Sequence, residues 1–364
     1  MAGNKGEWSE AYVFLKLLGD GKLYAADQNL NKITDLFYPI IKIIRSEIGS
    51  KRDYLTNGEI TIIDGYTKEI LLKVSKIEFI KKANELFQEL KKAKGRSFEV
   101  PSLEQFLKSI YYAKDKSEHS KKTDIRIVVH DLHTGLKPTL GFSIKSMIGK
   151  EATLFNGGDG TNFIYKFTDV KHTEEEIKLI NAIKPTGKES KITLRINSLL
   201  NRGAKINFVG VQSENLKWNL ELIDTKLPEI LAHLLLYKYA YGIKSSFNEL
   251  LKVLLEKNPL NFNLSNSHPF YEYKLKNFLA DAALGMTPEK IWKGIYDATG
   301  GIIIVKENGE VVCYHIYNRN DFQDYLLNNT KLNQTSTTRY KWGDLYLQKD
   351  NPYIKLNLCV RFND

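Results

Sequence analysis

The sequence predicts a mixed fold, α/β or α+β, built on a mixed β-sheet. Two observations support this class: several segments repeat apolar residues at helical spacing, and short β-branched runs alternate with turn residues. At 364 residues the chain is long enough for one large domain or two of ordinary size. We place a boundary near residue 225, with a core at 1–225 and a helical block with C-terminal strands at 226–364.

The N-terminal third is interpreted as mainly helical. Helical periodicity predicts helices in "EWSEAYVFLKLLGDG", "KIEFIKKANELFQELKKAKG" and "PSLEQFLKSIYYAK". The middle of the chain predicts strands in "DIRIVVHD", "TLGFSIKS" and "TNFIYKFTD", and then a helix that Thr173 opens. Residues 190–222 are expected to alternate strand-like runs with turns.

The second half predicts a helical block followed by strands. Helices are expected in "LPEILAHLLLYKYAYG", "SFNELLKVLLEK" and "EYKLKNFLADAALG", and another in "PEKIWKGIYDATG", where Pro288 suits a helix start. "GIIIVKENGEVVCYHIYN" predicts a hairpin that turns at Asn308 and Gly309. "TSTTRYKWGDLYLQ" and "YIKLNLCVRF" are expected to be strands.

Composition narrows the class of protein. The net charge is +10, from 53 Lys and Arg against 43 Asp and Glu, which favours a polyanionic partner such as nucleic acid. A lysine excess from an AT-rich genome would look the same. Two cysteines cannot build a disulfide framework, and no apolar run approaches the roughly 20 residues of a membrane span. With no apolar leader at the N-terminus, we expect a cytoplasmic protein of a bacterium or archaeon, without membrane association.

The strand pair at 123–146 carries the strongest chemical signal. Asp124 opens the first strand, Lys145 ends the second, and Ser143 lies two residues before that lysine. Side chains two residues apart share a strand face, so Ser143 and Lys145 point the same way. An Asp on one strand, an acidic residue on its neighbour and a Lys two residues further on are an economical way to build a Mg²⁺-dependent phosphodiesterase site. Here a serine stands where the second acid is expected.

A second carboxylate must therefore come from elsewhere. The candidates are Glu10 in the first helix, Glu151 in "GKEATL" and Asp159 in "NGGDG". Asp131, at the far end of the first strand, is a weaker fourth because it adjoins the turn. The plain alternative is an ordinary hairpin with charged ends, in which Glu10 is only a favourable charge near a helix N-terminus.

Four stretches together resemble one family: "NKGEWSEAYVFLKLL", "TDIRIVVHD", "LGFSIKS" and "TSTTRYKWGDLY". They are similar to the HpaII-type Type II restriction endonucleases, within the PD-(D/E)XK nuclease superfamily. The resemblance implies a mixed sheet flanked by helices, with added helical and hairpin elements for DNA recognition. It puts the motif aspartate at Asp124, the motif lysine at Lys145, and the motif acid at Ser143, where this chain departs. Some relatives with Ser-x-Lys recruit a later acid, which favours Glu151 or Asp159.

Many members of the superfamily instead use a glutamate of the first core helix, and Glu10 in "GEWSE" matches that position. The resemblance therefore implies a Mg²⁺ site at Asp124 and Glu10. It further implies double-strand cleavage of DNA at a short palindrome, CCGG for the HpaII type. A palindrome implies a homodimer, and a restriction enzyme implies a companion DNA methyltransferase.

The segment 336–341 is the candidate for reading DNA. Arg339 suits bidentate contact with guanine, and Lys341 with the hydroxyls of Ser336, Thr337 and Thr338 suits phosphate oxygens. A hydrophilic edge strand is the plain alternative. Two functional alternatives also stay open: another nuclease of the same superfamily, for repair or junctions, and a DNA-binding protein whose site is inactive. A phosphotransferase is disfavoured by the absence of a GxxxxGK[ST] motif.

Overall fold

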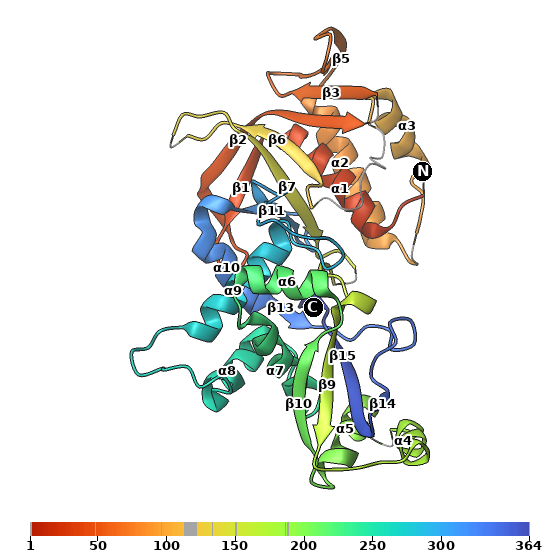
Figure 1. Ribbon diagram of the computed structural model, residues 1–364. Coiled ribbons are helices and arrows are strands. Elements are labelled where there is room, and N and C mark those ends of the chain that lie inside the picture. The colour runs from red at the N-terminus through yellow and green to blue at the C-terminus, as the bar shows by residue number, and fades with distance from the viewer. Residues whose placement is uncertain are drawn as a thin grey trace.

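The computed structural model describes residues 2–47, 49–95, 97–112, 122–132, 134–149, 151–185, 187 and 189–363. In Figure 1, the N-terminal helices and strands, coloured red to yellow, form the upper part of the molecule. Green helices and strands and most of the blue ones form the lower part, whereas the blue strand β11 lies beside β7 in the upper part. No helix in these described ranges is long and apolar enough to cross a membrane.

The helices of the described residues are α1 (Lys5–Asp20), α2 (Lys76–Lys92), α3 (Pro101–Ser109), α4 (Glu174–Asn181), α5 (Lys191–Leu200), α6 (Glu214–Ile223), α7 (Leu227–Tyr239), α8 (Phe247–Lys257), α9 (Phe270–Leu284) and α10 (Arg319–Asn329). The strands are β1 (Lys22–Ala26), β2 (Lys32–Glu47), β3 (Ser50–Leu55), β4 (Ile60–Asp64), β5 (Ile70–Val74), β6 (Ile125–Val129), β7 (Thr139–Ser146), β8 (Thr153–Phe155), β9 (Asn162–Thr168), β10 (Lys205–Val211), β11 (Gly301–Val305), β12 (Val311–His315), β13 (Thr330–Leu332), β14 (Leu345–Gln348), β15 (Asn351–Asn357) and β16 (Val360–Phe362). This mixture confirms the expected class, helices with a mixed sheet.

The largest sheet runs in the order β1-β12-β11-β7-β6-β2-β3-β4-β5 among the described residues. β2, β6 and β7 are antiparallel neighbours, whereas β11 lies parallel to β7. The long strand β2 pairs with β1 through its first half and with β6 and β3 through its second. This double pairing bends the sheet back on itself and leaves β6 and β7 in its middle.

Two hydrophobic cores cover the large sheet. One core packs α1, α2 and α3 against the even positions of β7, including Phe142 and Ile144. The other joins α7, α8, α9 and α10 to the opposite side of β11 and β12. β11 is buried throughout, and its Ile303 and Ile304 belong to different cores. Burial on both faces explains its uninterrupted apolar sequence.

Two smaller sheets complete the described fold. One has the order β10-β9-β15-β14 and the other the order β13-β16-β8. Strands from both sides of residue 225 therefore share sheets, since β11 pairs with β7 and β15 pairs with β9. The division at 225 stays a prediction.

The N-terminal third is not mainly helical, which corrects the sequence interpretation. Five strands, β1 to β5, lie between α1 and α2 in the described part. The period-2 signal is present in β4, where Ile60 and Ile62 are buried and Thr61 and Ile63 are only half-buried. Such alternation indicates a strand with one covered face. The basic and polar residues on either side of β4 obscured this alternation in the sequence.

Residues 190–222 also differ from the expected strands and turns. They form α5, β10 and α6, and Ser190 and Ser213 accept hydrogen bonds from the first turns of the two helices. In α5, Ile192, Ile196 and Leu199 are buried at helical spacing. The helical period was present in the sequence and was missed.

The helix expected in "PEKIWKGIYDATG" is absent, because residues 286–300 run as an irregular loop. The Asn219 side chain donates to the carbonyls of Thr287 (3.2 Å) and Lys290 (2.7 Å) and accepts from the Trp292 N–H (2.8 Å). Backbone groups that bind a side chain in this way are not free to form helical hydrogen bonds. Gly294 adopts φ +74°, which also breaks a right-handed helix.

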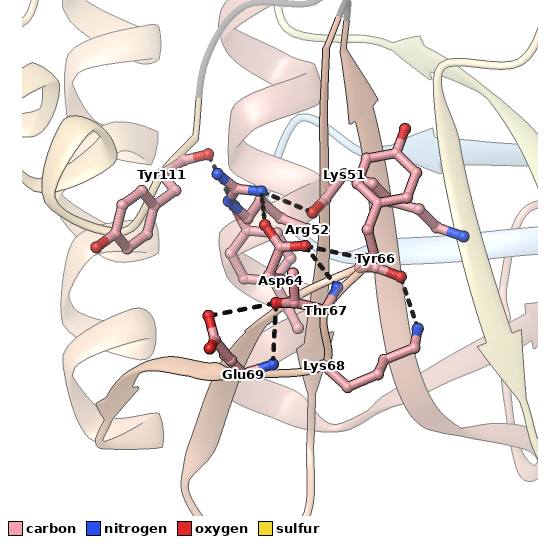
Figure 2. Close-up of polar contacts among 10 residues, drawn as sticks. Lys51, Arg52, Asp64, Tyr66, Thr67, Lys68, Glu69 and Tyr111 are labelled. Carbon is pink, nitrogen blue, oxygen red and sulfur yellow. Dashed lines mark hydrogen bonds and ion pairs between the residues drawn. The ribbon is translucent and has the colours of Figure 1, made fainter.

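A polar network fixes the far edge of the sheet. Figure 2 shows Arg52 of β3 paired with Asp64 of β4 at 2.7 Å. The other Asp64 oxygen accepts the N–H groups of Tyr66 (2.8 Å) and Thr67 (3.1 Å), which close the turn into β5. These hydrogen bonds hold the pKa of Asp64 below its ordinary value. This network stabilises the edge of the sheet, and its residues are distant in sequence from the strand pair at 123–146.

Candidate active site

Helix α1 brings Glu10 to the end of the central strands. The helix starts at a capping box, in which Glu7 N–H donates to Asn4 Oδ1 (3.0 Å) and Asn4 N–H donates to Glu7 Oε2 (2.8 Å). Ser9 Oγ donates to Ser146 Oγ at the end of β7 (2.9 Å). This contact ties α1 to β7 and positions the next residue, Glu10, beside the strand ends.

The β6–β7 pair brings the predicted motif residues together. The Asp124 carboxylate accepts from Ser143 Oγ (3.1 Å) and from the backbone N–H of Ile144 (2.6 Å). Lys145 Nζ donates to Ser143 Oγ (2.8 Å). Ser143 thus bridges Asp124 and Lys145 and fixes their relative positions. A serine in the motif's acidic position acts here as a hydrogen-bonded link between the other two residues.

Electrostatics show that Glu10 belongs to the same cluster. Burial and the nearby Asp124 charge raise the pKa of Glu10 to about 8, while Arg45 and Lys145 oppose the shift. With a pKa of about 8, the Glu10 carboxyl group needs a compensating positive charge if it is to be ionised at neutral pH. A cation bound between Glu10 and Asp124 would supply that charge.

The two carboxylates suit Mg²⁺ better than a metal that demands many protein ligands. Mg²⁺ is commonly held by one or two carboxylates and keeps several of its waters. Among the described residues, no three His, Cys, Asp or Glu side chains gather in a cluster that could hold a metal. Glu10 and Asp124 have carboxylate oxygens that could hold a hard cation of this kind.

The alternative carboxylates lie in other environments. Glu151 shares a cavity of about 140 Å³ with Lys145, but it is paired with Lys331 (3.2 Å) and Arg361 (3.6 Å). Asp159 is exposed and opens a short 3₁₀ turn that leads into β9, in a different sheet. Its position is set by Gly158, whose carbonyl accepts from Asn357 Nδ2 (2.8 Å). The structure therefore groups Glu10 with Asp124.

Two cations near the cluster were missed by the sequence interpretation. Arg45 of β2 lowers the pKa of Glu10 and stacks on Tyr112, with 4.0 Å from the guanidinium carbon to the ring centroid. Lys122 lies two residues before Asp124, and burial first and Lys145 second lower its pKa to about 8. Both residues approach the cluster only in the folded chain, since Lys122 lies before the first residue of β6 and Arg45 comes from β2.

A cavity of about 700 Å³ opens beside this cluster. Its lining comes from the start of α1, the end of α2 and the end of β7, and includes Lys145. Lys145 therefore faces both the hydrogen-bonded cluster and an accessible space, as a side chain that acts on a bound substrate must.

Comparisons with known proteins identify the family of the chain. The family model for the HpaII restriction endonuclease matches residues 4–362. The chain belongs to the HpaII restriction endonuclease family. It is 44% identical to the Type II restriction enzyme HpaII of Haemophilus parainfluenzae over 363 residues, which cover 99% of this chain and 98% of that enzyme. No solved structure matches the chain.

Family membership confirms the resemblance seen in the sequence and identifies the chain as a restriction endonuclease of the HpaII type. The match runs over the whole cluster, from Glu10 through Lys145, and also over the segment 336–341. The roles of individual residues in this HpaII-family chain are inferred from their geometry.

The segment 336–341 forms a turn and not the expected strand. Tyr340 N–H donates to the Ser336 carbonyl (3.2 Å). Trp342, the first residue after this segment, is buried against Tyr239. Ser336, Thr338, Arg339 and Lys341 are exposed. Trp342 thus acts as an anchor that presents the polar residues before it.

This turn in the HpaII-family chain also borders a basic cavity. Thr337, Thr338 and Lys341 line a space of about 350 Å³ together with Lys191 of α5 and Lys355 of β15. The buried Arg195 donates to the Gly343 carbonyl (2.6 Å) and pairs with Asp344, which holds the end of the segment. Lys191 and Lys355 were not predicted from the sequence, because they join the cavity only through the fold.

Proposed function

We propose that the chain is a Mg²⁺-dependent, site-specific deoxyribonuclease that cuts both strands of DNA at a short palindrome, with CCGG as the expected site. The observation that carries this proposal is the convergence of Glu10, Asp124 and Lys145 at the end of one strand pair. In a family of restriction endonucleases, two carboxylates and a lysine beside an open cavity suit phosphodiester hydrolysis.

Glu10 and Asp124 would hold Mg²⁺ through their carboxylate oxygens. When bound, the ion supplies positive charge to the phosphoryl oxygens and lowers the pKa of coordinated water. Ser143 keeps Asp124 in place through its 3.1 Å hydrogen bond and receives one hydrogen of Lys145 Nζ. The remaining hydrogens of Nζ orient the attacking water or stabilise the charge that develops on the phosphate. A bond forms between the water oxygen and phosphorus, and the bond to the leaving oxygen breaks as that oxygen gains a proton.

The PD-(D/E)XK assignment of the fold belongs to the same proposal. Its support is the order of elements: α1, then antiparallel β2, β6 and β7, then β11 parallel to β7. We further propose that residues 1–225 provide the catalytic core and that 226–364 provide most of the DNA-recognition elements. β11 and β12 complete the sheet on which the core depends.

DNA recognition is assigned to the turn at 336–341. Arg339 would contact guanine, and Ser336, Thr337, Thr338 and Lys341 would hold backbone phosphates next to the basic cavity. Arg339→Ala should weaken binding to the cognate duplex by roughly 1–3 kcal/mol and leave binding to an unrelated duplex unchanged. Equal loss on both duplexes, measured by titration, would mean that Arg339 contacts only the backbone.

A palindromic site is cut symmetrically by two copies of one chain, so we propose a homodimer on DNA. We also propose a companion DNA methyltransferase that protects the host's own sites. Sedimentation of the protein alone and with a cognate duplex tests the first of these. A complex with one chain per duplex would contradict it.

The decisive experiment uses long, unmethylated DNA of known sequence, with and without Mg²⁺, followed by sequencing of the fragment ends. Mg²⁺-dependent ends that share one palindrome support the proposal and give the site. Cleavage guided by DNA shape, without a shared sequence, would favour a repair or junction nuclease. Intact DNA with a stable complex would favour an inactive binding protein.

A further inference from the structure

Lys122 is the second lysine near the catalytic cluster, and it lies in the segment just before β6, the strand that pairs with the strand of Lys145. Its Nζ donates to the Leu154 carbonyl (3.2 Å), and its backbone N–H donates to Asp297 Oδ2 (3.4 Å). Thr123, the next residue, donates its hydroxyl to the Asp297 carbonyl. Lys122 is thus held on both sides, and its position is fixed relative to Asp124.

Three acidic residues and one lysine lie near the Lys122 side chain. Asp124, Glu289 and Asp297 favour its charged form, and the Lys145 ammonium opposes it. None of the described carboxylates lies within ion-pair distance of its Nζ. The Leu154 carbonyl accepts one hydrogen of the Lys122 ammonium group. A partly buried ammonium group near a second ammonium group suits an anion that binds between them.

We propose that Lys122 binds a phosphate of the DNA backbone, at or beside the phosphate that is cut. The inference rests on the proposed function and adds a residue that the motif does not contain. Lys145 approaches the phosphate from β7, and Lys122 approaches from the segment before β6. Two cations and a carboxylate-bound metal would then surround the phosphate, which concentrates positive charge where negative charge develops.

Lys238 of α7 provides a matched comparison. Its Nζ donates to a backbone carbonyl, that of Leu332, at 2.8 Å, and burial lowers its pKa to about 8, as for Lys122. The neighbouring charges differ, since Lys238 lies near Lys331 and Cys359 instead of Asp124. A lysine tethered to a carbonyl is therefore not by itself an anion site. Both lysines have another lysine nearby, so what distinguishes Lys122 is its position two residues before Asp124, with the carboxylates of Glu289 and Asp297 also near it.

The test compares Lys122→Gln, Lys122→Arg and Lys238→Gln with the wild-type protein. Glutamine keeps a hydrogen-bond donor and removes the charge, whereas arginine keeps the charge. Each protein is assayed with a duplex that carries the site found by fragment-end sequencing. The measurements are the single-turnover cleavage rate with Mg²⁺, the dependence of DNA affinity on salt without Mg²⁺, and the melting temperature.

For Lys122→Gln we expect cleavage to slow by about tenfold or more. The slope of log affinity against log salt should fall in magnitude by about 1, since one phosphate contact is lost. Lys122→Arg should restore the slope, and Lys238→Gln should leave rate and slope at the wild-type values. A Lys122→Gln protein with a lower melting temperature but wild-type rate and slope would overturn the inference. Wild-type protein that cuts no DNA would instead overturn the proposed function.

Discussion

Strand β6 has an aspartate before its first residue and another after its last, and the two carboxyl groups have opposite surroundings. Asp124 lies near Glu10 and Lys145, and Lys145 lines a cavity of about 700 Å³. Asp131 is 2% exposed and accepts the Thr134 N–H in a turn (3.3 Å). Sequence position alone does not separate them. Their neighbours do, because one carboxyl group faces a second carboxylate and the other completes a packed turn.

The Asp131 end is a packed aromatic cluster. His315 is 1% exposed, stacks on Tyr38 with ring centroids 4.9 Å apart, and contacts Phe142 edge-on at 6.2 Å. Its Nδ1 accepts the Tyr317 N–H (3.1 Å). Contacts of this kind stabilise the fold. The comparison therefore predicts that changes at the Asp124 end affect cleavage and that changes at the Asp131 end affect stability.

The largest expected effect is on the reaction itself. Asp124→Ala should reduce Mg²⁺-dependent cleavage on the order of a thousandfold or more, with DNA binding largely retained, and Lys145→Ala should do the same. Asp131→Ala, the matched change at the other end of β6, should keep cleavage and lose roughly 1–3 kcal/mol of stability. Cleavage assays and denaturant titrations of the variants measure both quantities. If Asp131→Ala abolished cleavage in a fully folded protein, the division between the two ends would be wrong.

The second prediction concerns the carboxylate that replaces the missing motif acid. Glu10→Gln should abolish cleavage, because it removes the partner of Asp124, whereas Glu151→Gln should leave most activity since Glu151 is paired with Lys331 and Arg361. Asp159→Asn is a further control from another sheet. Full activity of Glu10→Gln in a cleavage assay would transfer the metal-binding role to Glu151 or Asp159.

The third prediction is a pH effect confined to the Asp131 end. Burial lowers the pKa of His315 to about 4 from its ordinary 6.5, and the Asp131 charge only partly opposes this. A folded-state pKa below the unfolded one means that the unfolded chain takes up the proton first. Stability should therefore fall as the pH drops from 6.5 to 4, by at most about 3 kcal/mol.

His315→Asn keeps an acceptor for the Tyr317 N–H and removes the titrating ring. It should be less stable at neutral pH, yet lose less further stability than the wild-type protein between pH 6.5 and 4. Urea titrations across this range give both curves, and their difference removes the contribution of other groups. Parallel curves would show that His315 does not titrate differently on folding.

Much of the site was predictable, because its residues lie in local patterns. Asp124 and Lys145 sit at the ends of two short strands, and Ser143 follows from the period of two. Preferring Glu10 to the other candidate carboxylates required the family resemblance, since its approach to Asp124 depends on the Ser9–Ser146 contact between α1 and β7. The role of Lys122 was not predictable, because Leu154 and Asp297 meet it only in the folded chain.

The fold was predicted less evenly. The helices α7, α8 and α9 have long apolar repeats and were predicted correctly, as was the hairpin turn at Gly309, whose φ is +84°. The loop 286–300 was predicted as a helix, since its residues favour one. Asn219, from a helix far earlier in the chain, binds its backbone instead. Tertiary hydrogen bonds of this kind override local preference and leave no local signal.

The smallest expected effect is a shift in melting temperature, which tests Mg²⁺ binding in the absence of DNA. A ligand that binds only the folded protein stabilises it by about 1.4 kcal/mol at ten times its dissociation constant. Mg²⁺ should therefore raise the melting temperature of the wild-type protein and of Asp131→Asn, which keeps Glu10 and Asp124. It should leave Asp124→Asn unchanged, because one carboxylate of the pair is gone. A calorimetric scan with and without Mg²⁺, at matched ionic strength, measures each shift. If Mg²⁺ stabilised Asp124→Asn as much as Asp131→Asn, the ion would bind elsewhere. The Asp124 end of β6 would then not be a metal site, although the raised pKa of Glu10 indicates two neighbouring carboxyl groups there.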